Sequence, residues 1–517
     1  MLDYLIQNAR IIDDSGSKEF AGNVGLQDGK ICLCGQDTPA KEVIDAKGRY
    51  LLPGFIDCHS HGDLLVDQSD LAPYKITQGI TTDVAGHCGS SVAPVDPRAS
   101  GVAHPEWEHY PAYLDSMDAL PKVGHSMFLV GHCTLREAVM GMDNRKPTAA
   151  EMDKMKALLK EAMEAGARGF STGLIYPPSC YADEEELVEL AKVMAPYDGI
   201  YTSHMRNESD GVVEAVKETI NIGRRAGVKV LISHHKVLGK RNWGRQKETL
   251  AVIEQANKEG VQVFCDQYPY TRTMTYLNAC IPPWHFSDGY EAMAEKLKSP
   301  AFRKQLKEEM ENPETPYDNF YLNTNGWNDI LICSGSATPD ALGKTVAAYA
   351  DFLGKDVWET FFDVCVLNKC KNYAVYTSMC DEDVCEIFQY PRCMVGTDGV
   401  SLPWNLPNHP RSTSTFPHAI NFFYKEKQLM PLEQVVHKMT GLPATFIALP
   451  NKGFIRDGYD GDLVLMNLDA LQEGADFRCV NGYCKGIDMV FVDGCPVYAD
   501  GAFTGKTPGR ILRHKKS

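Results

Sequence analysis

The chain has 517 residues, of which 44% are hydrophobic and 23% charged, and its formal net charge is −16. This length and composition are those of a globular protein with two or three domains, or with one large barrel and additions to it. The acidic balance excludes a nucleic-acid partner, because phosphate binding needs a basic surface, but a few buried cations could still bind a small anion.

The sequence carries no sign of export or of a membrane span. Residues 1–30 contain no basic segment followed by an apolar one, so no secretory leader is expected. No apolar stretch approaches the roughly 18 residues that a transmembrane helix needs. The 17 cysteines are scattered, without a CxxC pair, which favours reduced, buried thiols. We therefore expect a cytoplasmic protein that does not contact a membrane.

Short strand-like runs with turns make up residues 1–50, and the same pattern returns at the end of the chain. Asp28-Gly29 is a hairpin turn signal near the start. Asp493-Gly494 and Asp500-Gly501 are turn signals near the end. We expect the two ends to form one small β-sandwich domain.

The middle of the chain alternates strand-like and helix-like segments. Eight strand-like runs end in polar residues, namely LPGFIDCHSH, ITTDVAGHCG, SMFLVGHC, ARGFSTGLIY, IYTSHM, VKVLISHHK, VQVFCDQYPY and CMVGTDG. Residues 149–166 and 183–197 between them are strong helix candidates. The pattern predicts an α/β fold, a (β/α)8 barrel over residues 51–425, with a long insertion at about 281–390 before the last barrel strand. Residues 426–517 would add the last barrel helix and the rest of the β domain.

His59 and His61 end the first of these runs, with Asp57 and Asp63 beside them. Side chains two apart in a strand share a face, so both imidazoles can point into the barrel mouth and hold one metal ion. Active sites of such barrels lie at the carboxyl ends of the strands. The sequence therefore predicts a metal site there.

Three other runs end in possible partners for these histidines. His204 lies in YTSHMRNE and Asp398 in GTDG. In VLISHHK, strand alternation places His234 and Lys236 on one face and His235 on the other, and either face could point inward. One polar residue at a strand end is often a cap, but four strands that all end in His or Asp point to a shared site.

Histidines with a carboxylate or thiolate around an open position favour zinc, and hydrolysis by an activated water is its usual chemistry. ARGFSTGLIY contains no Lys that could serve as a carbamylated bridge between two metals. Cys88, with glycines on both sides of the His87-Cys88 pair, could bind one zinc or bridge two. A lone Cys is more often an inert, buried residue. We expect the side chain of His87 to pack in the protein interior.

The motifs of this chain resemble those of a known family. PGFIDCHSH with flanking β-rich ends resembles the amidohydrolase superfamily. The ordered series GHCGSSVAP, GHCTLR, GLIYPPSCYA, TSHMRNES, ISHHK, DQYPY, GTDG and HPRSTSTFP resembles its D-aminoacylase (N-acyl-D-amino-acid deacylase) branch. The resemblance covers nearly the whole chain and implies zinc-dependent hydrolysis of the amide of an N-acyl-D-amino acid, a small-molecule substrate.

The resemblance also implies metal ligands. Cys88, His204 and His234 match the ligands of a tightly held zinc ion. His59 and His61 match a second, weaker site that shares Cys88. This implication selects His234 as the ligand in VLISHHK.

The remaining implied roles concern proton transfer and substrate. Asp398 matches a catalytic carboxylate at the metal site. Lys236, Arg411, Tyr176 and Tyr268 match residues that position the substrate, and the two cations among them would hold its α-carboxylate.

The chain departs from the family pattern after YPY, where TRTMT replaces small residues. Arg272 in this segment could meet a second carboxylate, which would favour an N-acyl-D-glutamate or -aspartate, although a salt-bridged Arg is an equal alternative. His87 stands where the family usually has Asn. These changes concern side-chain preference rather than hydrolysis.

Three other functions compete with this one. A cyclic-amide hydrolase such as a hydantoinase or dihydroorotase usually needs the carbamylated Lys, which Cys88 replaces here. An amidohydrolase acting on another amide is the second alternative. A metal-free scaffold is the third, and its usual sign, missing ligands, is not seen.

Overall fold

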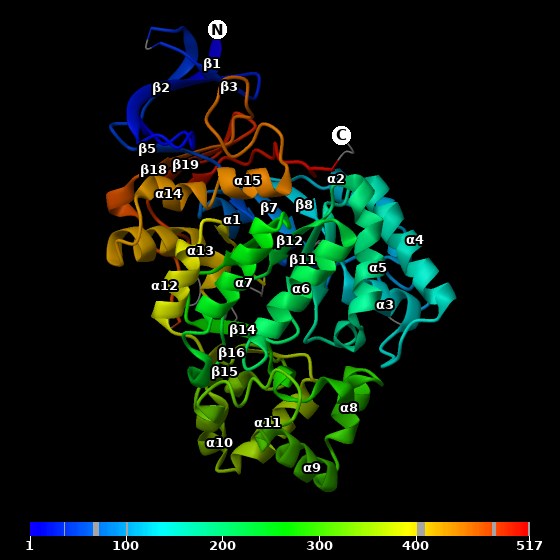
Figure 1. The fold of residues 1–517 in the computed structure, drawn as a ribbon. Coiled ribbons are helices and arrows are strands. Elements are labelled where there is room, and N and C mark those ends of the chain that lie inside the picture. Colours follow the sequence, from blue (N-terminus) through cyan, green and yellow to red (C-terminus); the bar gives the residue numbers. More distant parts are fainter. Residues whose placement is uncertain (36, 66–71, 100–101, 401–408, 478–481, 515–517) are drawn as a thin grey trace.

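The computed structural model describes residues 1–35, 37–65, 72–99, 102–400, 409–477 and 482–514. Its centre is a barrel of eight parallel strands surrounded by helices (Figure 1). The strands are β6 (Phe55–Asp57), β7 (Ile80–Ala85), β8 (His125–Phe128) continued by β9 (Val130–Gly131), β10 (Gly169–Gly173), β11 (Ile200–His204), β12 (Lys229–Ile232), β13 (Val263–Gln267) and β17 (Cys393–Val395). A parallel bridge between Ser60 and Gly399 joins the last strand to the first and closes the barrel. Each of the eight predicted strand runs supplies one barrel strand.

The helices around the barrel begin and end at clear sequence signals. The helix α4 (Ala149–Ala165) has a capping box, in which Thr148 and Glu151 bond to each other's backbone N–H, and it ends at Gly166 with a φ of 113°. Asp183 caps α5 (Glu184–Met194) by accepting from the backbone N–H of Glu186. Other barrel helices are α2 (Tyr110–Ala119), α3 (His132–Met140), α6 (Val212–Ala226), α7 (Gln246–Lys258), α12 (Asp381–Gln389) and α13 (Arg411–Ala419).

The barrel interior is apolar at one end and polar at the other. Inward side chains of seven strands form one hydrophobic cluster, which α15 (Gly441–Ile447) closes with Leu442 and Phe446; the strand members are Ile56, Val84, Met127, Ile200, Leu231, Phe264 and Met394. Because side chains alternate, the next inward positions lie nearer the carboxyl ends of the strands. The polar residues singled out in the sequence occupy this second end.

The β domain is built from both ends of the chain, as predicted. Its nine strands are β1 (Leu2–Ile11), β2 (Phe20–Gln27), β3 (Lys30–Leu33), β4 (Ala40–Asp45), β5 (Tyr50–Pro53), β18 (Leu463–Met466), β19 (Ile487–Val492), β20 (Cys495–Ala499) and β21 (Ala502–Phe503). Antiparallel pairing of β5 with β18 joins the two halves. The three predicted Asp-Gly turns connect β2 to β3, β19 to β20 and β20 to β21, with positive φ at both residues of each turn.

A helical insertion lies at the opposite end of the barrel from the β domain (Figure 1). It contains the antiparallel strands β14 (Arg272–Tyr276), β15 (Ile330–Ile332) and β16 (Tyr373–Thr377). Its helices are α8 (Tyr290–Lys296), α9 (Pro300–Glu311), α10 (Val346–Leu353) and α11 (Val357–Leu367), and they pack around a hydrophobic core that includes Trp327, Trp358 and Phe361. In the part of the chain that the structure describes, no helix combines the length and the apolar character that a membrane crossing requires.

Candidate metal centre and active site

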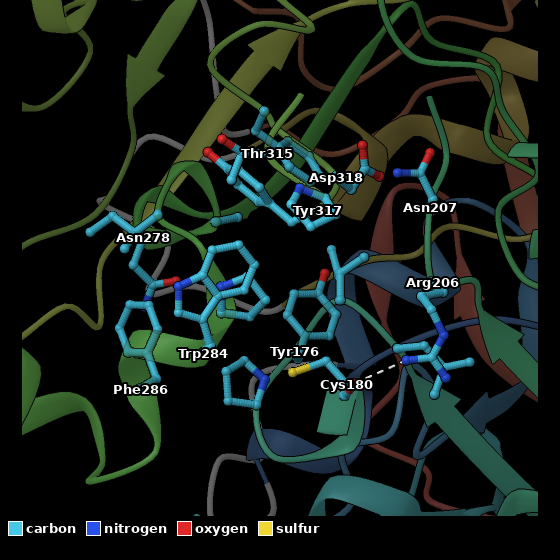
Figure 2. Close-up of a pocket in the computed structure, with 18 of the residues that line it drawn as sticks. Tyr176, Cys180, Arg206, Asn207, Asn278, Trp284, Phe286, Thr315, Tyr317 and Asp318 are labelled. Carbon is cyan, nitrogen blue, oxygen red and sulfur yellow. Dashed lines mark hydrogen bonds between the residues drawn. The ribbon is translucent and has the colours of Figure 1, made fainter. Parts of the chain in front are cut away.

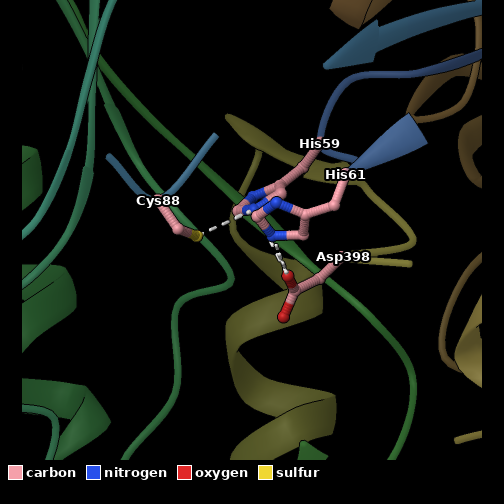
Figure 3. A group of neighbouring side chains, drawn as sticks. All are labelled: His59, His61, Cys88 and Asp398. Atoms are coloured by element: carbon pink, nitrogen blue, oxygen red, sulfur yellow. Dashed lines mark hydrogen bonds and ion pairs between the residues drawn. The ribbon is translucent and has the colours of Figure 1, made fainter. Parts of the chain in front are cut away.

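Six side chains predicted from the sequence converge at the carboxyl end of the barrel. They form two groups, each with its possible ligand atoms within 4.8 Å of one another: His59, His61, Cys88 and Asp398 in the first (Figure 3), and Cys88, His204 and His234 in the second. All six are buried. Cys88 belongs to both groups and therefore occupies the shared position that a bridging ligand requires.

The backbone around Cys88 turns so that its sulfur faces histidines from two strands. Its Sγ lies 3.3 Å from Nε2 of His59 and 3.3 Å from Nε2 of His234. Cys88 has a φ of 52°, a left-handed conformation that costs energy in a residue with a Cβ. A side chain on Gly89 would meet the backbone N of Gly173 at 2.6 Å, so only glycine fits there. Burial raises the pKa of the Cys88 thiol well above its usual range. Only a nearby cation would hold it as the thiolate that binds metal.

A similar turn brings His234 into the site. Leu231 points into the barrel, so simple alternation would direct His235 inward and His234 outward. The strand β12 ends at Ile232, however, and His234 has a φ of 37°, which reverses the order. His235 instead contacts Thr249 of α7 through its Nε2 at 2.9 Å. The structure therefore places His234, and not His235, beside Cys88.

The rings of His204 and His234 suit metal ligation. Within the described chain, neither ring nitrogen of His204 has a hydrogen-bond partner, although both are buried. An orphaned buried nitrogen is costly and is relieved by a metal ion. Burial lowers the pKa of both imidazoles well below the usual range, so they are neutral, which is the form that binds metal.

Two carboxylates that the sequence analysis missed orient the histidines. Asp266 lies 3.0 and 3.1 Å from Nδ1 of His59 through its two oxygens. Glu208 lies 3.1 Å from Nδ1 of His234 and 3.6 Å from Nε2 of His204. Asp266 can hold the proton of His59 on Nδ1 and leave Nε2 for a metal. Glu208 lies beside His204 and His234 as a negative charge, and Nδ1 of His234 accepts from the Lys236 ammonium. Asp266 sits in the seventh strand run and Glu208 four residues after His204, and both positions could have signalled these roles.

Asp398 contacts both the histidine group and a cation. Its Oδ1 lies 3.1 Å from Nε2 of His61 and 3.5 Å from Nε2 of His59, and its Oδ2 lies 2.8 Å from the Arg411 guanidinium. Burial acts to raise the pKa of Asp398, but Arg411 and the histidines outweigh it and hold this pKa well below the usual range. The carboxylate is therefore ionised and able to accept a proton.

A cavity of about 260 Å³ opens onto these groups. Its walls include Arg411 and Tyr176 together with His61, Cys88, His204, His234 and Asp398. The Arg411 guanidinium also donates to the carbonyl of Met274 at 3.1 Å. The ring of Tyr176 lies 4.9 Å from that of His204, and its hydroxyl is 2.8 Å from Oγ1 of Thr275. Two of the five predicted substrate residues thus face the cavity.

The other three predicted substrate residues are not among the described residues that line it. Nζ of Lys236 is 2.7 Å from Glu208 and 2.7 Å from Nδ1 of His234. Tyr268 donates from its hydroxyl to Thr273, and its ring lies 4.8 Å from the Arg411 guanidinium. Arg272 lies on β14, with its guanidinium 4.3 Å from the ring of Phe477. His87 stacks on His59 with ring centroids 4.1 Å apart.

A barrel with a His, Cys and Asp cluster at its carboxyl end defines a class of metal-dependent hydrolases, and the comparisons agree. Residues 42–300 match the amidohydrolase family. The chain belongs to this family and is a hydrolytic enzyme that acts on amide bonds. The resemblance read from the sequence is confirmed.

Within the family, the chain is similar to deacylases of N-acyl-D-amino acids. It is 34% identical to a D-aminoacylase of Alcaligenes xylosoxydans xylosoxydans, over 99% of this chain and 97% of that protein. It is also 34% identical to an N-acyl-D-aspartate deacylase of the same organism, over 99% of this chain and 95% of that one. An N-acyl-D-glutamate deacylase of Bordetella bronchiseptica, solved with zinc and a phosphonate inhibitor that mimics the tetrahedral intermediate, superposes with a TM-score of 0.84 at 34% identity, covering 99% of both chains. A D-hydantoinase structure, at 16% identity and a TM-score of 0.59, shares the fold.

Proposed function

We propose that the protein hydrolyses the amide bond of N-acyl-D-amino acids with zinc as cofactor, releasing a carboxylate and a free D-amino acid. The observation that carries this proposal is the convergence of Cys88 with four histidines and Asp398 beside a cavity that also presents Arg411. The sulfur takes the shared position, which distinguishes this site from one that depends on a carbamylated Lys.

Cys88, His204 and His234 would hold the tightly bound zinc ion, because their ligand atoms cluster and neither ring nitrogen of His204 has a hydrogen-bond partner in the described chain. His59 and His61 offer a second, weaker position next to the same sulfur, with Asp398 at its edge. When bound, zinc acts as a Lewis acid that polarises the acyl carbonyl and makes water acidic enough to attack near neutral pH.

Asp398 is the proton-transfer group. Its ionised carboxylate accepts the proton of the attacking water and then delivers it to the nitrogen of the leaving amine, first as general base and then as general acid. Arg411 holds one oxygen of this carboxylate at 2.8 Å and so fixes its direction.

Arg411 also supplies the cation for the substrate's α-carboxylate, since its guanidinium lines the cavity and its planar fork matches a carboxylate. Lys236 is paired with Glu208 behind His234. Its charge adds positive potential to the cavity although its side chain does not line it. Tyr176 bounds the substrate on the side of His204. A small N-acyl amino acid with a free, anionic α-carboxylate is therefore the partner that this cavity suits.

Reduced cysteines support a cytoplasmic setting for this enzyme. The described cysteines are free thiols, among them the functional Cys88. Thiols persist in a reducing compartment and are commonly oxidised to disulfides outside it.

The experiment that tests this function is a panel of N-acetylated D- and L-amino acids with amine release measured before and after removal of metal by a chelator. We expect turnover of D-substrates alone, loss with the chelator and recovery with added zinc. Turnover restricted to L-substrates, or activity that survives complete metal removal, would contradict the proposal.

A further inference from the structure

A second, larger cavity adjoins the metal cavity. Its volume is about 670 Å³, and it lies between the loops after β10 and β11 and the insertion (Figure 2). Four residues line both cavities: Tyr176, Pro177, Tyr290 and Phe320. The two spaces are therefore neighbours that share one wall.

The position of this wall indicates which part of the substrate approaches it. Arg411 follows β17, the eighth barrel strand, whereas Tyr176 follows β10, the fourth. Strands four apart in a closed eight-stranded barrel lie on opposite sides of its mouth. A substrate whose α-carboxylate binds Arg411 and whose amide lies over Cys88 therefore directs its acyl group towards Tyr176 and the second cavity.

Aromatic side chains from the insertion and from the segment after β10 form part of the wall of this cavity. Trp284 is half-buried, and its ring lies 5.9 Å from that of Tyr317. The hydroxyl of Tyr317 donates to the carbonyl of Cys280 at 2.9 Å, and that of Tyr181 donates to the carbonyl of Pro283 at 2.8 Å. With their hydroxyls bonded elsewhere, these side chains offer ring faces, which suit apolar groups.

Three of the four charged residues that line the cavity are bonded to other residues, and the fourth, Glu314, is exposed. Arg206 bonds to Glu218 at 2.9 Å, and Asp210 bonds to Arg241 at 2.7 Å. Asp318 accepts from the hydroxyl of Ser209 at 2.6 Å. Because an anionic ligand would meet three carboxylates and would compete with Glu218 for Arg206, the walls favour a neutral ligand over an anionic one.

The volumes of the two cavities also indicate that the larger one holds part of the substrate. At about 260 Å³, the metal cavity falls below the range of roughly 300–1,000 Å³ that is usual for small-molecule sites, whereas 670 Å³ falls in the middle of it. Resting on the function proposed above, we propose that the second cavity is an acyl-chain subsite and that the preferred substrates carry an apolar acyl group of medium length rather than acetyl.

The test compares acetyl, butanoyl, hexanoyl and octanoyl derivatives of the D-amino acid that the enzyme turns over best. Each methylene group moved from water into an apolar site is worth a factor of about two to four in affinity. We expect kcat/KM to rise by about that factor per methylene from butanoyl to octanoyl.

Two variants locate the effect. Trp284→Ala removes an aromatic wall, and Ala279→Trp fills the same cavity with a bulky ring. Both should lower the octanoyl-to-acetyl ratio of kcat/KM by about tenfold or more. Trp243→Ala serves as the matched control, because Trp243 is 39% exposed and lies outside both cavities, and it should leave the ratio unchanged.

The outcomes separate this proposal from the function on which it rests. Turnover of N-acetyl-D-substrates with no gain from longer acyl chains would overturn the acyl-chain subsite and leave the deacylase function intact. The subsite is also overturned if Trp284→Ala and Ala279→Trp both keep the wild-type ratio, or if a glycylglycyl group is preferred to octanoyl. A complete absence of turnover with every N-acyl-D-amino acid would refute both.

Discussion

Glu208 joins a buried cation to two histidines of the proposed metal site, and its removal should be unusually costly. One of its oxygens lies 2.7 Å from Nζ of Lys236 and 3.1 Å from Nδ1 of His234. Glu208 is 1% exposed and Lys236 is 3% exposed. Burial acts to lower the pKa of Lys236, but Glu208, Tyr268 and Asp398 outweigh it and raise this pKa, so the ammonium is kept.

Glu208→Gln leaves that ammonium without its counter-ion in the protein interior. Breaking a buried ion pair on one side costs about 3–5 kcal/mol of unfolding free energy, and Lys236→Met should cost a similar amount by stranding the carboxylate. The double variant removes both charges, so its loss should fall short of the sum of the single losses by about 3 kcal/mol. Urea unfolding of the metal-free proteins measures these values.

The same substitution should weaken zinc binding, because the partner of a ligating histidine typically contributes a factor of about 10–100 in metal affinity. Competition with a chromophoric chelator gives this factor for Glu208→Gln. Glu259→Gln is the control, since it breaks an exposed pair with Arg224 at 2.7 Å and should change neither quantity. Strictly additive single losses, or zinc affinity that is unchanged in Glu208→Gln, would refute the reasoning.

Three further predictions concern the cavity. Asp398→Asn should keep its zinc, as measured by elemental analysis, and lose a factor of about 10²–10⁴ in kcat, whereas retained turnover would rule out its role in proton transfer. Burial acts to raise the pKa of Asp398, but Arg411 and the histidines hold this pKa low. Because the ionised carboxylate is the base, activity is present above this pKa and is lost as the pH falls through it. Arg411→Met should therefore move the acid limb of kcat/KM to higher pH and raise KM, and an unshifted limb would contradict the pairing. Arg272 could bind a second carboxylate of the substrate. In that case Arg272→Ala should reduce the preference for N-acetyl-D-glutamate over N-acetyl-D-methionine. An unchanged preference would exclude that contact.

The strands and turns were predictable because their signals are local. The eight apolar runs became the eight barrel strands, and each Asp-Gly pair, such as Asp28-Gly29, forms the expected turn with positive φ. His59 and His61 indicated a candidate metal site from the sequence alone. They are two residues apart at the end of one strand, so their side chains share a face.

Other parts of the site depend on contacts that no local pattern encodes. Alternation from Leu231 would have selected His235, and only the backbone turn at His234, with its φ of 37°, reverses that choice. Asp266 and Glu208 stand at positions that the sequence marks, but only the folded chain places their carboxylates beside His59 and His234. The placement of Arg272 against Phe477 depends on a contact across 205 residues of chain, which alternation and spacing cannot predict.

We propose that the sulfur of Cys88 binds the catalytic zinc, and X-ray absorption at the zinc edge tests this contact most directly. The wild-type protein loaded with one equivalent of zinc should show one sulfur neighbour at about 2.3 Å together with nitrogen or oxygen neighbours at about 2.0–2.1 Å. Cys88→Ala should lose the sulfur signal, tight zinc binding and turnover together. A wild-type spectrum with nitrogen and oxygen neighbours alone, or a sulfur signal that persists in Cys88→Ala, would contradict the account.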